Sequence, residues 1–258
     1  MNFSTLRLSL LFCLAATCAT AAADNHPQPF TVRYDVQYSG ARVAETTFTL
    51  RPTPDSDMYE LRSITEPRGL AALIRYGDVV EESHFRLLDD HVRPVDYRFN
   101  DGTRKGKRNG SIFFDWVDAT AQSTYKGSDA THALMGGETD RLLLQWQLAR
   151  DLKNESLNSA YRLIERNEIK EYKVTVLGEE VLITEAGQLR AIKLRRQRTG
   201  SSRATLIWAA VEHGYLPVKM VQLIDERPNV VLQVTELKLE SKNAADEVVD
   251  PVLESTDP

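Results

Sequence analysis

Five histidines are the residues best suited to binding a metal or transferring protons, namely His26, His84, His91, His132 and His213. A zinc site commonly takes ligands at close spacing, such as two histidines four residues apart on a helix. The closest pair, His84 and His91, is seven residues apart on two predicted strands joined by a turn. The two could face each other across that strand pair beside Glu82, but the spacing favours ordinary surface histidines. We therefore predict no metal site.

Signatures of nucleophilic catalysis and of cofactor binding are missing from the sequence. It contains no Gly-x-Ser-x-Gly elbow, no phosphate-binding glycine loop and no dinucleotide fingerprint. The acidic pair Glu81-Glu82 lies in a predicted strand, where adjacent side chains point to opposite faces and do not act together. We therefore predict no catalytic residue and no cofactor, with an uncharacterised enzyme kept only as a third hypothesis.

Two basic clusters stand out in a chain whose net charge is −5. The residues we single out for contact with anionic groups are Arg104, Lys105, Lys107 and Arg108 in the first cluster, and Arg195, Arg196 and Arg198 in the second. Such clusters suit phospholipid or lipid A phosphates at a membrane surface, or an acidic protein partner. The alternative, which is the commoner use of such charge, is a solvated hairpin face that protects strand edges.

Aromatic residues are the other lead, because they could line the concave side of a curved sheet. The candidates for contacting an apolar ligand are Tyr34, Tyr38, Tyr97, Phe99, Phe114, Trp116 and Trp208. Curved sheets covered by a helix can hold a lipid or another apolar small molecule. The alternative is a filled core between sheet and helix, and the pattern favours the filled core slightly.

The elements that position these residues are mainly strands. Alternating apolar and polar residues, as in 30–38, recur every 8–12 residues along the chain, with glycine-rich turns between them. Helical spacing of leucines and Trp146 predicts one helix over 138–153. Gly178 is expected to be a turn between strands 168–177 and 180–186. The predicted fold is mainly β, with a large curved or partly closed antiparallel sheet and one covering helix.

The ends of the chain carry different signals. Residues 1–23 combine Arg7, a short apolar stretch and small residues, which is typical of a secretory signal cleaved near Asp24. A lipoprotein anchored at Cys18 is the less favoured alternative. Removing Arg7 with this segment changes the net charge from −5 to −6, so we expect no nucleic-acid partner. We predict one domain over 24–241 and a disordered acidic tail over 242–258.

Several short motifs follow one another in a characteristic order. These are the alternation Phe30-x-Val-x-Tyr-x-Val-x-Tyr-x-Gly40, then Phe114-Asp115-Trp116, a short helix, Leu206-Ile207-Trp208, and Leu216-Pro217-Val218-Lys219. In this order the chain, over roughly residues 30–239, resembles the exported bacterial family called domain of unknown function 3108. The resemblance implies a periplasmic, β-rich, single-domain protein from a Gram-negative bacterium. It supplies no catalytic residues, and the longer charged tail departs from the family's pattern.

Two main hypotheses of function follow from these patterns. The first is a periplasmic protein of otherwise unknown function that binds a lipid or other apolar ligand in the curved sheet, with peripheral membrane contact. The second is a structural or interaction protein that supports envelope assembly through its sheet edges and charged hairpins, with another envelope protein as partner. A cavity inside the sheet would favour the first hypothesis, and a tight core would favour the second.

Overall fold

The computed structural model describes residues 27–54, 56–69, 72, 77–88 and 91–240. The predicted signal segment 1–23 and the predicted tail 242–258 lie outside these residues. No helix in the described part of the chain is both long and apolar enough to span a membrane.

Strands dominate the described residues, as the alternating sequence predicts. The strands of the first half are β1 (Phe30–Tyr38), β2 (Ala41–Pro52), β3 (Met58–Pro67), β4 (Val79–Leu88), β5 (His91–Asn100), β6 (Gly110–Asp115), β7 (Thr120–Tyr125) and β8 (Ser128–Ala133). Those of the second half are β9 (Glu138–Thr139), β10 (Ala160–Glu165), β11 (Glu168–Thr184), β12 (Gly187–Arg198), β13 (Arg203–Ala210), β14 (Leu216–Ile224) and β15 (Arg227–Leu239). Helix α2 (Leu143–Lys153) and a short 3-10 turn, η1 (Val211–His213), complete the fold.

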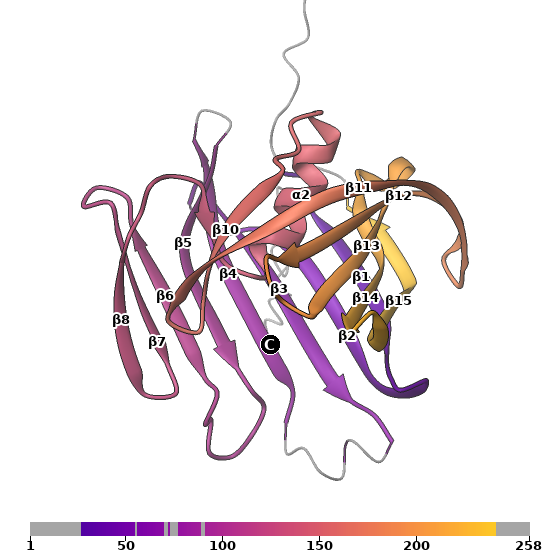
Figure 1. Cartoon of the computed structure of the whole chain (residues 1–258), viewed down its shortest axis with the longest axis horizontal. Helices are drawn as coiled ribbons and strands as arrows, with labels where there is room; N and C mark the ends of the chain where they lie inside the picture. Colours follow the sequence, from indigo (N-terminus) through magenta and orange to yellow (C-terminus); the bar gives the residue numbers. More distant parts are fainter. Residues whose placement is uncertain (1–26, 55, 70–71, 73–76, 89–90, 241–258) are drawn as a thin grey trace, which may run out of the picture.

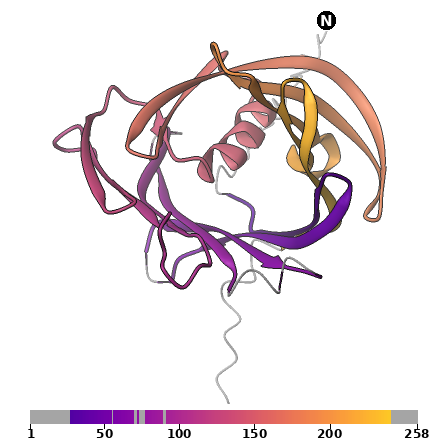
Figure 2. The same ribbon diagram turned by 60° about the horizontal axis from the view of Figure 1, so that its bottom comes forward.

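All fifteen strands form one sheet in the order β8-β7-β6-β5-β4-β3-β2-β1-β15-β14-β13-β12-β11-β10-β9. Every pairing is antiparallel except the short β9–β10 contact. The sheet curves around α2, which lies on its concave side (Figures 1 and 2). The predicted curved antiparallel sheet with a covering helix is therefore confirmed.

The two ends of the sheet approach each other without pairing as strands. Asn167, in the turn between β10 and β11, donates from Nδ2 to the carbonyl of Ser128 at 2.7 Å. Its Oδ1 accepts a hydrogen bond from Ser123 Oγ at 2.9 Å. Side chains therefore link β7 and β8 to the opposite end of the sheet, and the fold resembles a barrel that is left open.

The concave face forms the core because apolar side chains point inward at every second position. In β1, Phe30, Val32 and Tyr34 are buried while their neighbours are more exposed. Helix α2 fills the space inside the curve, with Trp146 packed on Phe85 at 4.8 Å between ring centres. The residues that were candidates for a ligand pocket are therefore largely part of a packed core.

Helix α2 begins later than its apolar spacing predicts. Glu138 belongs to β9 instead, and its fully buried carboxylate accepts the N–H groups of Met135 and Gly136 and pairs with Arg162 at 2.8 Å. Asp140 then accepts the N–H groups of Leu142 and Leu143, which would otherwise have no partner at the start of the helix. The predicted start at 138 is therefore wrong.

Gly178 is not a turn, contrary to the sequence prediction. It lies within the single long strand β11, at φ +133°, where the register with β12 shifts between Val176 and Gly178. A glycine in this region of backbone space is typical of a bulge, which bends a strand without ending it. Two predicted strands are therefore one, and β11 and β12 form a long hairpin whose end projects past its neighbours (Figure 1).

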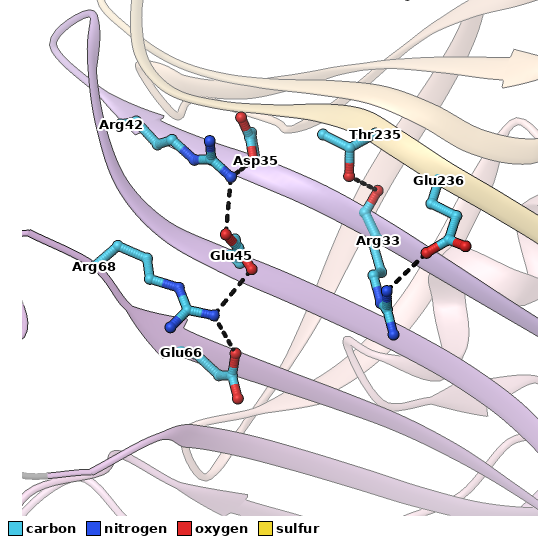
Figure 3. Close-up of polar contacts among 8 residues, drawn as sticks. All are labelled: Arg33, Asp35, Arg42, Glu45, Glu66, Arg68, Thr235 and Glu236. Atoms are coloured by element: carbon cyan, nitrogen blue, oxygen red, sulfur yellow. Dashed lines mark hydrogen bonds and ion pairs between the residues drawn. The ribbon is translucent and has the colours of Figure 1, made fainter. Parts of the chain in front are cut away.

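Charged side chains on the outer face of β1 to β3 and β15 are matched to one another. Arg42 binds both Asp35 and Glu45, and Arg68 joins Glu45 to Glu66. Figure 3 shows this ladder, together with the neighbouring pair between Arg33 and Glu236 at 2.8 Å. Exposed pairs of this kind contribute little to stability. They show how a solvated face looks when its charges are balanced.

Candidate functional site

Charged residues of the concave face meet at the start of α2. Arg141 Nε donates to Glu81 Oε2 at 2.6 Å and to Tyr97 Oη at 2.9 Å, and Tyr97 Oη donates to the same carboxylate at 2.7 Å. The guanidinium of Arg141 also lies 4.5 Å from the centre of the Phe99 ring. Burial, and then the charge of Glu81, raises the pKa of Tyr97 well above its usual value. Tyr97 therefore serves here as a hydrogen-bond donor and not as a base.

Asp140 is a second buried acid next to this cluster. Burial raises its pKa from 3.8 to about 6, although hydrogen bonds from Leu143, Ser83 and Leu142 act in the opposite direction. A carboxyl group that titrates near neutral pH can act in acid–base catalysis. Here the side chain is fully buried, and both oxygens are taken up by the helix N–H groups and by Ser83 Oγ at 2.6 Å. Asp140 therefore fits the role of a helix cap.

Arg196 differs from the other members of its basic cluster because its charged end is buried. Its Nε and Nη1 are covered and have no hydrogen-bond partner among the described residues, and only Nη2 reaches Thr205 Oγ1, at 3.4 Å. Tyr172 lies beneath the guanidinium at 5.5 Å, and burial lowers the pKa of Arg196. The nearby carboxylate of Glu165 is already held by Tyr172 and Lys170. The positive charge of Arg196 is therefore poorly compensated.

The other two residues singled out in the second basic cluster lie in different environments. Arg195 Nη1 binds Glu226 Oε2 at 3.0 Å, and Arg198 is exposed at the end of β12. With Arg196 buried, the structure does not bring these three residues together. The first cluster stays together, because Arg104, Lys105, Lys107 and Arg108 are all exposed on the loop 101–109 between β5 and β6.

The aromatic candidates fall into three environments, of which the buried one holds Tyr34, Tyr97, Phe114 and Trp208. Tyr34 Oη donates to the carbonyl of Pro217 at 2.6 Å. Trp208 lies between the ammonium groups of two lysines and donates from Nε1 to Glu180 at 2.6 Å. Tyr38 is 53% exposed at the end of β1. The remaining two, Phe99 and Trp116, are half-buried and pack against arginine side chains.

The two histidines with the closest spacing do not meet. His84 lies opposite Asp96 in the β4–β5 register, with 3.2 Å between His84 Nδ1 and Asp96 Oδ1, whereas His91 lies opposite Leu88. Glu81 and Glu82 point to opposite faces, as predicted: Glu81 faces Arg141, and Glu82 pairs with Arg62. Within the described residues, no group of three potential ligands could hold a metal.

Ser123 is a buried hydroxyl beside a histidine, an arrangement that catalytic serines also use. Its Oγ lies 2.8 Å from His132 Nε2 and donates to Asn167 Oδ1 at 2.9 Å. In the Ser-His-Asp triad, the histidine that activates the serine is itself oriented by a carboxylate. In the part of the chain that the structure describes, no carboxylate contacts His132. The arrangement therefore links the two ends of the sheet, as described above.

A free strand edge runs along the far part of β11. Only residues 168–173 of β11 pair with β10, whereas its pairing with β12 continues to Thr184. Residues 175–184, the β11 edge, therefore have no strand partner among the described residues on the side away from β12. Four large apolar residues on this segment are exposed, namely Val176 at 51%, Leu177 at 49%, Val181 at 54% and Ile183 at 90%.

An outer groove of about 630 Å³ lies on the convex side of β3 to β7. Its lining residues include Arg62, Glu82 and Arg98 from the strands and Gly106 and Asn109 from the loop 101–109. The loop that carries the first basic cluster therefore borders this groove. Of the seven aromatic candidates, only Phe99 is among its lining residues.

Neither the β11 edge nor the outer groove was predicted as such. Signals for both are present in the sequence: apolar residues lie on both sides of the Gly178-Glu179-Glu180 segment, and basic residues flank Gly106. Because Gly178 was interpreted as a turn, the sequence predicted two short strands here and not one long strand with a free edge. The groove depends on how a loop lies against five neighbouring strands, which local patterns do not specify.

Comparisons with known proteins agree with this fold. The family model described as "Protein of unknown function (DUF3108)" matches residues 33–225. A β-barrel-like protein of domain of unknown function DUF1849 from Brucella abortus has 9% identity and a TM-score of 0.53, over 83% of this chain and 98% of that chain. At this identity the likeness concerns the fold alone. No curated protein matches the chain.

Two more distant solved structures share less of the fold. One is a protein with YmcC-like fold from Bacteroides fragilis, with 9% identity and a TM-score of 0.38, over 82% of this chain and 96% of that chain. The other is from the MucA/MucB complex of Pseudomonas aeruginosa, with 12% identity and a TM-score of 0.36, over 84% of this chain and 54% of that chain. Both TM-scores lie below 0.5, so these likenesses carry no weight for function.

Proposed function

The chain belongs to the DUF3108 family of proteins of unknown function, and on that premise we propose that it is an exported envelope protein that binds a protein partner along the β11 edge. The observation that carries this proposal is the free edge itself. An edge strand presents unpaired N–H and C=O groups, and an extended segment of another protein can pair with them as an added strand.

The side chains of the β11 edge support partner binding. Natural edge strands are usually short or guarded by charge, which prevents unwanted pairing. Here each acidic residue at the bulge has a basic partner on β12: Glu180 binds Lys193 at 2.8 Å, and Glu179 lies 3.3 Å from Arg190. Exposed Val181 and Ile183 then offer apolar contacts to an incoming strand.

The occupant that fits best is an extended, apolar segment of a different protein. A second copy of the chain, paired antiparallel about the middle of the edge, would place Glu179 and Glu180 of one copy near the same residues of the other. Like charges that face each other across a strand pair are destabilising. The charges therefore favour a different chain over self-association.

Export is part of the proposal, and residues 1–23 support it with their basic, apolar and small-residue segments. Amino-terminal sequencing of the protein purified from the periplasm should give a start near Asp24. Recovery from the cytoplasm with residues 1–23 intact would contradict export. A lipid-modified Cys18 at the start of the purified protein would instead identify it as a lipoprotein.

Photocrosslinking in living cells tests the partner proposal. We expect a photoreactive amino acid at Val181 or Ile183 to give an adduct with one protein of the envelope. The same amino acid at Val117, which is 95% exposed on the β6–β7 turn, serves as the matched control. The adducts should also disappear with Leu177→Lys in the same chain. Equal labelling at Val117, or no adduct at the edge, would refute the proposal.

A second candidate function is the binding of a lipid or another apolar ligand inside the sheet. The poorly compensated charge of Arg196 favours it, since an acidic head group could bind there. The packing of Trp146 against Phe85 stands against it, because a ligand would have to displace α2. Native mass spectrometry of protein from an envelope extract tests this function. A ligand-free mass, together with no binding of a fluorescent fatty acid, would rule it out.

A further inference from the structure

The outer groove and its basic loop form a positively charged site that is separate from the β11 edge. Two basic residues, Arg62 and Arg98, line the groove, and the loop that borders it through Gly106 and Asn109 carries four more, namely Arg104, Lys105, Lys107 and Arg108. Among the lining residues Glu82 is the one acid, and it is paired with Arg62 at 3.1 Å. The side chain of Arg98 is 71% exposed, and its ion-pair partner among the described residues, Asp96, lies at 3.7 Å and also contacts His84.

The backbone of the loop 101–109 is held in place next to the groove. Buried Asp101 accepts hydrogen bonds from the N–H groups of Thr103 and Arg108 and from Thr103 Oγ1. Gly102 packs so closely on the backbone of Asp78 that an added Cβ would lie 2.7 Å from its carbonyl oxygen. Hydrogen bonds and close packing therefore fix the loop backbone next to the groove.

Two asparagines make the groove rich in hydrogen-bond donors. Asn100 Oδ1 accepts the N–H of Gly102 at 3.0 Å, and Asn109 Oδ1 accepts the N–H of Asp101 at 3.0 Å. Both acceptor atoms are therefore engaged by the loop, which leaves the Nδ2 groups as donors. Ser111 adds an exposed hydroxyl. Donors and guanidinium groups together match the chemistry of a phosphate.

The charge balance of this region contrasts with the ladder on β1 to β3. There each arginine binds one or two carboxylates. In the described part of the chain, Lys105 and Lys107 have no ion-pair partner. A volume of about 630 Å³ is within the usual range for small-molecule sites, so a lipid head group fits the space.

We propose that the outer groove binds the phosphate head group of an anionic lipid and thereby brings the protein to a membrane surface. The loop lysines approach the surface charge, and Arg98 with the asparagine and serine donors contacts the phosphate within the groove. Partner binding at the β11 edge is not needed for this contact, so a failure of one proposal does not affect the other.

Vesicle cosedimentation of the purified protein tests the proposal. The probe is a vesicle of phosphatidylcholine with phosphatidylglycerol, compared with phosphatidylcholine alone. A variant with Arg98→Gln, Lys105→Gln and Lys107→Gln should bind the anionic vesicles roughly a hundredfold less tightly, because each basic residue near a membrane surface contributes about 1 kcal/mol. The matched control is Arg51→Gln, Arg203→Gln and Arg227→Gln, which removes the same charge from exposed positions away from the groove.

The outcomes separate the groove from charge in general. Loss of binding in the groove variant and normal binding in the control support the proposal. An equal loss in both variants, or no preference for anionic vesicles, overturns it. Glycerol 1-phosphate serves as the soluble probe. Weak competition of this compound with the vesicles supports a head-group site. Tight binding of the compound by a protein that does not bind vesicles overturns the lipid assignment. Binding of the unmodified protein should also weaken as salt increases.

Discussion

Arg141 and Glu81 lie 60 residues apart in sequence, yet Arg141 Nε and Glu81 Oε2 are 2.6 Å apart in the folded protein. Their contact ties the start of α2 to β4 and places the helix within the curve of the sheet. The exposed fractions of the two side chains are 31% and 19%, so water screens this pair only in part. The position of α2 therefore depends on a partly buried charged hydrogen bond as well as on apolar packing.

The first prediction concerns this contact. Glu81→Gln should lower the free energy of unfolding by about 2 kcal/mol, since the acceptor of the charged hydrogen bond becomes neutral while Arg141 keeps its charge. Glu66→Gln removes an exposed partner of Arg68 and should change the same quantity by less than about 0.5 kcal/mol. Urea unfolding monitored by tryptophan fluorescence measures both. Equal effects would contradict the assigned role of Glu81.

The second prediction concerns the dependence of stability on pH. Because burial raises the pKa of Asp140 in the folded state to about 6, the folded state binds this proton more tightly than the unfolded state. Its contribution to stability is therefore fully present below about pH 4 and is lost as the pH rises through 6. Asp140→Asn keeps an acceptor for the helix N–H groups and does not titrate. Between pH 4 and 7 the unmodified protein should lose up to about 3 kcal/mol relative to this variant. If the free energies of unfolding of the two proteins changed in parallel with pH, Asp140 would not titrate in this range.

The third prediction concerns the buried end of Arg196. Arg196→Met should raise the free energy of unfolding by about 1–3 kcal/mol, since a poorly compensated buried charge is replaced by an apolar side chain of similar length. Arg195→Met, on the neighbouring residue, removes the contact with exposed Glu226 and a hydrogen bond to Gln197, and should have little effect. Thermal or urea unfolding compares the two. Destabilisation by Arg196→Met would mean that its charge has a favourable partner.

The fourth prediction concerns the packed interior. Trp146→Ala should lower the free energy of unfolding by about 3–5 kcal/mol, because a large side chain that packs on Phe85 is removed from the core. Trp116→Ala, at a half-buried position, should lower the free energy of unfolding by a smaller amount. If Trp146→Ala left stability unchanged, the space inside the curve would not be filled by α2, and the ligand-binding alternative would gain support.

Strands were the part of the fold that local sequence patterns described best. Alternation in 30–38 reports burial on one face of a strand, and this property depends only on side-chain direction. The start of α2 was misjudged because Glu138 suits a helix start by composition, whereas its buried contact with Arg162 is a long-range one. Gly178 signals a break in any local analysis, and only the continued pairing with β12 identifies it as a bulge.

The candidate site was less accessible to sequence reasoning. Arg195 and Arg196 look alike in a basic cluster, yet alternation along β12 sends them to opposite faces, and only one becomes buried. The loop 101–109 was correctly recognised as exposed and basic. Arg98 was not predicted as a site residue, because only the folded sheet places it in the groove beside this loop. Which strand edge remains free depends on the length of β10 relative to β11, and such a difference has no local signature.

Hydrogen exchange on the complex with the crosslinked partner tests the central claim most directly. The amides of residues 175–184 should exchange at least tenfold more slowly in the complex than in the free protein, because an added strand protects backbone N–H groups. Val181→Lys with Ile183→Lys should abolish this protection, whereas Val117→Lys with Met135→Lys, at other exposed apolar positions, should preserve it. Unchanged exchange over 175–184, with protection elsewhere in the chain, would contradict partner binding at the β11 edge.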